Sequence, residues 1–315
     1  MAHHVLIFGG TGLLGEHITN AIVHSADKLG QISLFTSENT IWTKSEYINL
    51  LKQRGVTILS GNISSKHDVT EAFTGVDIVV SCVGRQAISK QIDLIQWADE
   101  HPDVKHFFPS EFGTDIEYGP ASAHEPPHQQ KLKVRAALKQ VKNLDYTYVV
   151  TGPYGDGNSG CYLSAMKPEA EVIGTFNVAE KRAILLGDGH GKISLTTMRD
   201  VGKFVVASIL HLSHVKNKAL KVNSFTSTPA SILKEFERQT GSTWEHSTTS
   251  LEDLKSTETK AWASESPTAT MTTLRRIWTE GGTLYSKRDN DLIGMEMGTD
   301  SLESAVAQAI EIQKA

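Results

Sequence analysis

Two histidines and a glutamate lie close together at His124-Glu125-Pro126-Pro127-His128, in the spacing H-E-x-x-H that zinc proteases use. In those enzymes one continuous helix places both histidines on the same face, where they bind the metal. Two prolines between the histidines remove backbone donors and clash with the preceding turn, so a helix cannot continue through this site. We therefore interpret the match as accidental and expect no metal. His124 is expected in a loop, where it faces either a bound small molecule or solvent.

A second chemical signal is the glycine-rich turn near the start of the chain. An apolar run from His4 to Phe8 is typical of a buried strand, and apolar residues recur at helical spacing from Leu13 to His24. Glycine lets the backbone approach a bulky anion, and the N-terminus of a helix presents free N–H groups to it. The pattern predicts a dinucleotide site whose pyrophosphate contacts the turn residues Gly9, Thr11, Gly12, Leu13, Leu14 and Gly15.

The end of the second predicted strand indicates which dinucleotide binds. An acidic residue there would bond the 2′-hydroxyl of NAD, whereas it would repel the 2′-phosphate of NADP. The strand ends at Thr36 and Ser37, whose hydroxyls can donate hydrogen bonds, and no acid comes before Glu38. Lys44 either adds a positive charge to this site or lies exposed on the surface. We therefore expect NADPH as the cofactor.

The elements that must position these groups alternate along the first half of the chain. Apolar strand candidates lie at 32–35, 56–59, 76–80, 104–108 and 146–150, with helical patterns between them at about 45–54, 66–74, 87–100 and 129–141. This alternation predicts an α/β fold with a doubly wound parallel sheet, Rossmann-like, whose ligands bind beyond the carboxyl ends of the strands. The ends of the fourth and fifth strands should therefore line the cofactor with Ser81, Cys82, Val83, Gly84, Pro109 and Ser110.

The second half is less regular. Short strand candidates lie near 172–176, 182–187, 193–196 and 219–223, and helical patterns lie at about 200–212, 229–240, 250–263, 270–279 and 300–313. Asp200 is expected to cap the first of these helices. We predict a dinucleotide-binding domain at 1–152 and a smaller α+β substrate lobe at 153–315 that partly interleaves with it.

Composition narrows the class of protein. The chain has 315 residues, of which 39% are hydrophobic and 21% charged, as in soluble globular proteins. The net charge is −5 and there is no cluster of basic residues, so the sequence gives no electrostatic reason to expect nucleic-acid binding. No stretch approaches the roughly 18 apolar residues of a membrane span, and no signal peptide precedes the first strand. Cys82 and Cys161 are the only cysteines, so we expect a reducing cytoplasmic location. A small-molecule substrate is the expected partner, and the protein is expected to be a monomer or homodimer.

Further motifs lie between residues 107 and 154. The segment Phe107-Phe108-Pro109-Ser110-Glu111-Phe112-Gly113 covers the end of the fifth predicted strand and the residues that follow it. Lys131 and Arg135 are four residues apart and share one face of a predicted helix. With the glycine turn and Val150-Thr151-Gly152-Pro153-Tyr154, these segments resemble the isoflavone reductase and phenylcoumaran benzylic ether reductase group, within the NmrA-like, atypical short-chain dehydrogenase/reductase class. The chain is most similar to the fungal branch of this group. The resemblance spans most of the chain and is strongest in the first 155 residues.

The resemblance implies NADPH-dependent reduction of a small phenolic or conjugated metabolite, such as an enone or quinone methide, in secondary metabolism. It places Lys131 near the nicotinamide as the catalytic residue. An ammonium there can stabilise or protonate an oxygen that gains negative charge, whereas a lysine of lowered pKa can act as a base on a phenol. Candidates for the substrate pocket are Phe112, Tyr118, His124 and Tyr154.

The chain departs from the family pattern at two positions of the cofactor site. Thr36-Ser37 stands where the family often has arginine, and Asn62 stands where an aspartate is common. No tyrosine has a lysine four residues further on, which argues against the ketone reduction of ordinary short-chain dehydrogenases. Two other functions stay open: an NmrA-type redox-sensing regulator that binds NADP(H) without catalysis, and a cofactor-assisted isomerase or dehydratase. Such regulators tend to lack the lysine, so Lys131 favours an enzyme.

Overall fold

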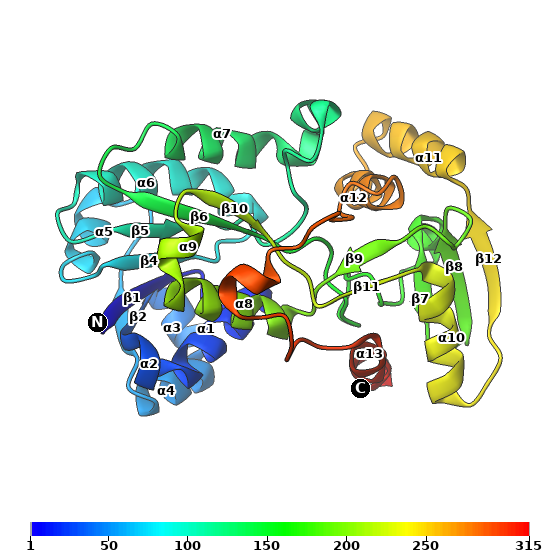
Figure 1. Ribbon diagram of the computed structural model, residues 1–315, viewed down its shortest axis with the longest axis horizontal. Helices are drawn as coiled ribbons and strands as arrows, with labels where there is room; N and C mark the ends of the chain where they lie inside the picture. Colours follow the sequence, from blue (N-terminus) through cyan, green and yellow to red (C-terminus); the bar gives the residue numbers. More distant parts are fainter. Residues whose placement is uncertain (1, 315) are drawn as a thin grey trace.

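In the computed structural model, which describes residues 2–314, a parallel sheet of seven strands forms the centre of the larger of two lobes (Figure 1). In spatial order the strands are β10 (Lys218–Lys221), β6 (Asp145–Val150), β5 (His106–Phe108), β4 (Ile78–Ser81), β1 (His3–Phe8), β2 (Gly30–Thr36) and β3 (Thr57–Ser60). The chain runs outward from β1 to β3 and then returns to β4, so the strand order reverses between β1 and β4. Ligands of doubly wound sheets bind at such a reversal. The predicted Rossmann-like α/β fold is confirmed.

Helices cover both faces of this sheet. They are α1 (Leu13–His24), α2 (Ala26–Leu29), α3 (Glu38–Thr43), α4 (Ser45–Gln53), α5 (Lys66–Ala72), α6 (Gln91–Glu100), α7 (Gln129–Leu138), α8 (Met198–Leu210) and α9 (Leu212–Val215). Successive side chains of β1 enter different cores: Val5 and Ile7 lie in the core with α1, α4 and α8, while Leu6 and Phe8 lie in the core with α5, α6 and α7. Burial on both faces explains why β1 is a continuous apolar run.

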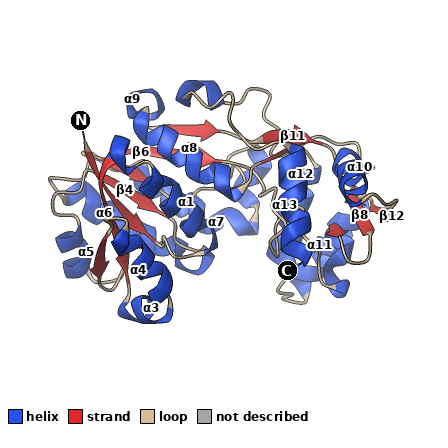
Figure 2. Cartoon of the chain, turned by 90° about the horizontal axis from the view of Figure 1, so that it is seen from below, coloured by secondary structure: helices blue, strands red, loops and turns tan. Residues whose placement is uncertain are grey.

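A smaller lobe lies beyond one end of the sheet (Figure 2). Its three-stranded sheet joins β7 (Thr175–Asn177), β8 (Arg182–Leu186) and β12 (Glu245–Thr249), and a separate antiparallel pair joins β9 (Ile193–Leu195) to β11 (Phe225–Ser227). The helices of this half are α10 (Pro229–Thr240), α11 (Leu251–Ala263), α12 (Ala269–Thr279) and α13 (Leu302–Lys314). Between β9 and β11 the chain returns to the large sheet, where β10 pairs with β6 and α8 packs against α1. The domain boundary at residue 152 stays a prediction.

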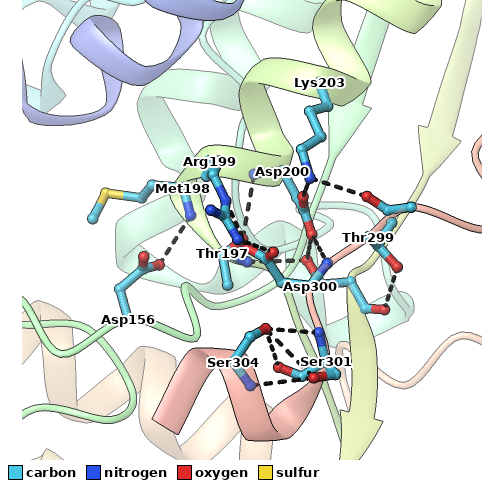
Figure 3. Close-up of polar contacts among 12 residues, drawn as sticks. Asp156, Thr197, Met198, Arg199, Asp200, Lys203, Thr299, Asp300, Ser301 and Ser304 are labelled. Carbon is cyan, nitrogen blue, oxygen red and sulfur yellow. Dashed lines mark hydrogen bonds and ion pairs between the residues drawn. The ribbon is translucent and has the colours of Figure 1, made fainter. Parts of the chain in front are cut away.

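A buried polar cluster joins three segments where the lobes meet (Figure 3). Thr197 donates a hydrogen bond to Asp300 at 2.6 Å, and the backbone N–H of Asp300 donates to Asp200 at 2.6 Å. Lys203 forms an ion pair with Asp200 at 2.6 Å, and Asp156 accepts a hydrogen bond from the N–H of Met198 at 3.0 Å. The cluster therefore ties the loop after β6 and the segment before α13 to the start of α8.

Local structure corrects two sequence predictions. Asp200 does not cap α8: Thr197 occupies the cap position, and its hydroxyl accepts a hydrogen bond from the N–H of Asp200. The helix predicted over 87–100 is a 3₁₀ turn at Arg85–Lys90 followed by α6. No helix among residues 2–314 has both the length and the apolar character needed to cross a membrane.

Candidate active site

The glycine turn between β1 and α1 is closely packed. Gly9 has φ +71°, in the left-handed region that favours glycine, and its carbonyl accepts a hydrogen bond from the N–H of Gly12 at 3.1 Å. A Cβ added to Gly15 would lie 2.1 Å from the Gly9 oxygen, which excludes any larger residue without a shift of the turn. Gly12 is the N-cap of α1 and has no side chain to satisfy the helix N–H groups. The turn therefore leaves a helix N-terminus open to an anion.

A cavity of about 620 Å³ lies against this turn, and we call it the central cavity. Most of the residues predicted to bind the cofactor line this cavity, namely Gly9, Thr11, Gly12, Leu13, Leu14, Gly15, Cys82, Val83, Gly84, Ser110 and Lys131. Ser81 and Pro109 are buried and do not line it. Ser110 is held in place, since its hydroxyl donates to the carbonyl of Val83 at 2.9 Å. The carboxyl ends of β1, β4 and β5 thus meet at one cavity.

A second cavity, the outer cavity of about 840 Å³, continues from the turn to the end of β2. Thr36, Ser37 and Asn62 line it, together with the carboxylates of Glu38, Asp68 and Glu71. Ser37 also caps α3, because its hydroxyl accepts from the N–H of Thr40 at 3.2 Å.

Lys44, a candidate for the cofactor site, does not line the outer cavity. Its ammonium donates to the carbonyl of Thr11 and forms an ion pair with Glu16 at 3.1 Å. Among residues 2–314 the outer cavity has no lysine or arginine in its lining. Recognition of a phosphate there would therefore depend on hydroxyl and backbone N–H groups.

Lys131 lies between the central cavity and a smaller inner cavity of about 210 Å³, and it lines both. It is the third residue of α7, and its ammonium donates to the carbonyl of Glu111 at 2.7 Å. Burial lowers the pKa of Lys131 to about 8, with further lowering by the nearby cations Arg85 and Arg135, while Glu111 opposes them. The amine is therefore held at a fixed point and gives up its proton more readily than an ordinary lysine.

Arg135 lies on the same helix and fixes the loop that holds Lys131. Its guanidinium binds the Glu111 carboxylate through two hydrogen bonds, at 3.1 and 2.8 Å, and Glu117 at 2.6 Å. It also stacks over the ring of Tyr148, 4.5 Å from the centroid. Arg135 is 1% exposed and lines neither cavity, so it positions the site and does not contact a ligand there.

The inner cavity extends from Lys131 toward the smaller lobe. Phe112 and Tyr154, two predicted substrate residues, line both the central and the inner cavity, and the Tyr154 hydroxyl donates to the carbonyl of Phe112. Met271, Leu274 and Trp278 of α12 also line the inner cavity. The second lobe thus closes the space beside Lys131 with apolar side chains, which suits an aromatic ligand.

Two other predicted substrate residues lie outside this cavity. Tyr118 donates to Glu125 at 3.1 Å and lines a separate surface pocket. His124 is exposed at the end of the 3₁₀ turn Pro120–His124 and lines neither cavity. A second 3₁₀ turn follows at Pro126–His128, which confirms that no helix continues between the two histidines.

Most of the residues that line the inner cavity were not predicted from the sequence, and two of them, Arg85 and His128, carry basic side chains. Arg85 follows Gly84 at the end of β4 and also lines the central cavity. His128 is buried immediately before α7, three residues from Lys131. The second histidine of H-E-x-x-H was the available signal in the sequence, because only this histidine directly precedes the helix that carries Lys131.

Comparison with known proteins identifies the family. The NmrA-like family model matches residues 1–303. Phenylcoumaran benzylic ether reductase PT1 of Pinus taeda is 31% identical over 211 residues, covering 65% of this chain and 64% of that protein. Eugenol synthase 1 of Petunia hybrida is 28% identical over 210 residues, with the same coverage. The matched part is thus less than two thirds of the length of these relatives.

Solved structures share the fold. Leucoanthocyanidin reductase of Vitis vinifera, solved with NADPH, superimposes with a TM-score of 0.80 at 19% identity, covering 98% of this chain and 99% of that one. An isoflavone reductase structure gives a TM-score of 0.80 at 22% identity with the same coverage. The fold and the site define a Rossmann-like protein with a glycine-rich turn between β1 and α1. The chain belongs to the NmrA-like family, as the resemblance predicted.

Proposed function

We propose that this protein is an NADPH-dependent reductase of a small phenolic or conjugated metabolite, with Lys131 as its general acid. The observation that carries the proposal is the position of the Lys131 amine, at the boundary between the central and inner cavities. Support comes from a relative named phenylcoumaran benzylic ether reductase and from a leucoanthocyanidin reductase of the same fold that was solved with NADPH.

The residues present fit this cofactor. The glycine turn and the open N-terminus of α1 are suited to a pyrophosphate, and the approach of Gly15 to Gly9 leaves no room for a side chain. Thr36 and Ser37 offer hydroxyls to a 2′-phosphate at the end of β2, in a cavity that the carboxylates of Glu38, Asp68 and Glu71 also line. When bound, NADPH supplies a hydride.

The chain's own residues then supply binding and proton transfer. Phe112, Tyr154 and Trp278 exclude water from the inner cavity and hold an aromatic substrate beside Lys131. Reduction of a conjugated system places negative charge on an oxygen, which the Lys131 ammonium stabilises and protonates. The carbonyl of Glu111 orients the amine, and Arg135 fixes the loop that carries this carbonyl.

The test is NADPH oxidation with a panel of aryl enones and phenolic quinone-methide precursors. Lys131→Met should abolish turnover while NADPH still binds. Lys133→Met is the matched control, because Lys133 is exposed on the same helix and lines neither cavity. Full turnover in Lys131→Met would refute the mechanism. Equal affinities for NADP⁺ and NADPH without any turnover would favour the redox-sensing regulator, and product formation without net NADPH consumption would favour the isomerase or dehydratase.

A further inference from the structure

His128 is a buried wall residue of the inner cavity. It is 2% exposed and lies at the end of the 3₁₀ turn that leads into α7, three residues before Lys131. Its ring packs edge-on against Tyr118, with 6.2 Å between the ring centroids. The imidazole therefore has a fixed place in the wall of the inner cavity.

The hydrogen bonding of the ring defines its tautomer. Nδ1 lies 3.1 Å from the carbonyl oxygen of Ser122. A carbonyl oxygen only accepts, so Nδ1 carries the hydrogen, and Nε2 of the neutral ring presents a lone pair. Burial lowers the pKa of His128, which keeps the ring neutral near pH 7.

Nε2 of His128 has no hydrogen-bond partner among the described residues, although it is buried. A buried acceptor without a donor is costly, and proteins leave few such groups without a functional reason. Other polar side chains of this cavity differ from this free acceptor: Thr114 accepts from the indole N–H of Trp278 at 2.8 Å, Tyr154 donates to the carbonyl of Phe112, and Arg85 can only donate. No aspartate or glutamate is among the described residues that line the cavity.

We propose that Nε2 of His128 accepts a hydrogen bond from a hydroxyl group of the substrate, so that the inner cavity selects free phenols over their ethers. This inference rests on the proposed function and adds the substrate group that the cavity recognises. His128 acts as a specificity-determining residue, and Lys131 keeps the catalytic role. A phenol O–H donates where a methoxy group cannot, and the methyl ether would also leave the acceptor buried without a partner.

The experiment compares two ligands that differ only in this group, 4-hydroxybenzalacetone and 4-methoxybenzalacetone. Their dissociation constants are measured on the protein saturated with NADP⁺, which has no hydride to transfer, by the change in tryptophan fluorescence, since Trp278 lines the cavity. The wild type should bind the hydroxy compound about 10-fold to 100-fold more tightly than the methoxy compound. His128→Phe keeps a flat ring without an acceptor and should reduce this ratio to about 1, whereas His128→Gln restores an acceptor and should recover part of it.

His124→Phe is the matched control, because the same exchange four residues upstream affects an exposed side chain outside the cavity. It should keep the wild-type ratio, and thermal melting should show that all variants are folded. A wild type without preference, including one that binds neither compound, would overturn the assignment, as would an unchanged ratio in folded His128→Phe. The binding ratio does not require turnover. A preserved preference without NADPH oxidation would therefore refute the reductase and leave the role of His128 standing.

Discussion

The protonation of Lys131 can be followed through the pH dependence of the reaction. Burial and the neighbouring arginines lower its pKa to about 8, from the ordinary value of 10.5. With a pKa of 8, about nine tenths of the amines are charged at pH 7 and about one tenth at pH 9. An ordinary lysine would stay almost fully charged over this range.

Because the proposed mechanism uses the charged form as an acid, activity should fall as the pH rises through 8. We expect kcat/KM for the substrate, at saturating NADPH, to decrease about tenfold between pH 7 and pH 9. Arg85→Met removes a nearby cation that lowers this pKa, so its profile should shift to higher pH. Initial rates of NADPH oxidation from pH 6 to pH 10 measure both effects.

Lys133→Met should reproduce the wild-type profile, because this exposed lysine takes no part in the site. A flat profile up to pH 9.5 would show that the Lys131 amine does not titrate near pH 8, and would refute the lowered pKa. Activity that rises through pH 8 would show that the neutral amine acts as a base, and would refute the acid role.

Three further perturbations test other parts of the structure. Burial raises the pKa of Asp156 to about 7, so the free energy of unfolding should fall as the pH rises from about 4 through 7. Asp156→Asn should be more stable than the wild type by about 2 kcal/mol at pH 8 but not at pH 4; urea unfolding that gives the same difference at both pH values would contradict the burial argument. Ser37→Asp adds a carboxylate to the outer cavity and should weaken NADPH binding at least about tenfold while leaving NADH binding unchanged. Titration of cofactor fluorescence measures both affinities, and an equal loss for the two cofactors would show that the 2′-phosphate binds elsewhere. In Gly15→Ala the added methyl group clashes with the Gly9 carbonyl, so NADPH affinity in the same titration should fall at least about tenfold. Gly119→Ala, whose methyl group meets open space, should keep the wild-type affinity, and normal NADPH binding by Gly15→Ala would show that the turn tolerates the methyl group.

The sequence was most informative where local pattern decides structure. The apolar run of β1 and the glycines after it predicted a strand, a turn and a helix, and alternation of such units predicted the parallel sheet. The same pattern indicated most of the residues that line the central cavity, because strand ends in such a sheet meet at one edge.

Contacts between distant segments explain what was missed. Lys44 pairs with Glu16 and the Thr11 carbonyl, an arrangement that depends on how α3 and α4 pack beside α1. His128 and His124 have the same residue type in one short motif, and only the packing of α7 buries one and exposes the other. The helix cap at Thr197 similarly depends on Asp200 being engaged by the backbone of Asp300, a hundred residues away in the sequence.

The pairing of β10 with β6 has a consequence for how the chain is made. The edge of the central sheet and its covering helix α8 lie after residue 197, beyond β7, β8 and β9 of the smaller lobe. During synthesis on the ribosome, one face of the sheet formed by the first 150 residues therefore stays uncovered, and β6 stays unpaired at the edge, until α8 and β10 have been made. Such late, long-range pairing slows folding and exposes apolar surface to aggregation. A fragment that ends at residue 152 would lack this cover permanently, so the cofactor site is best produced as part of the whole chain.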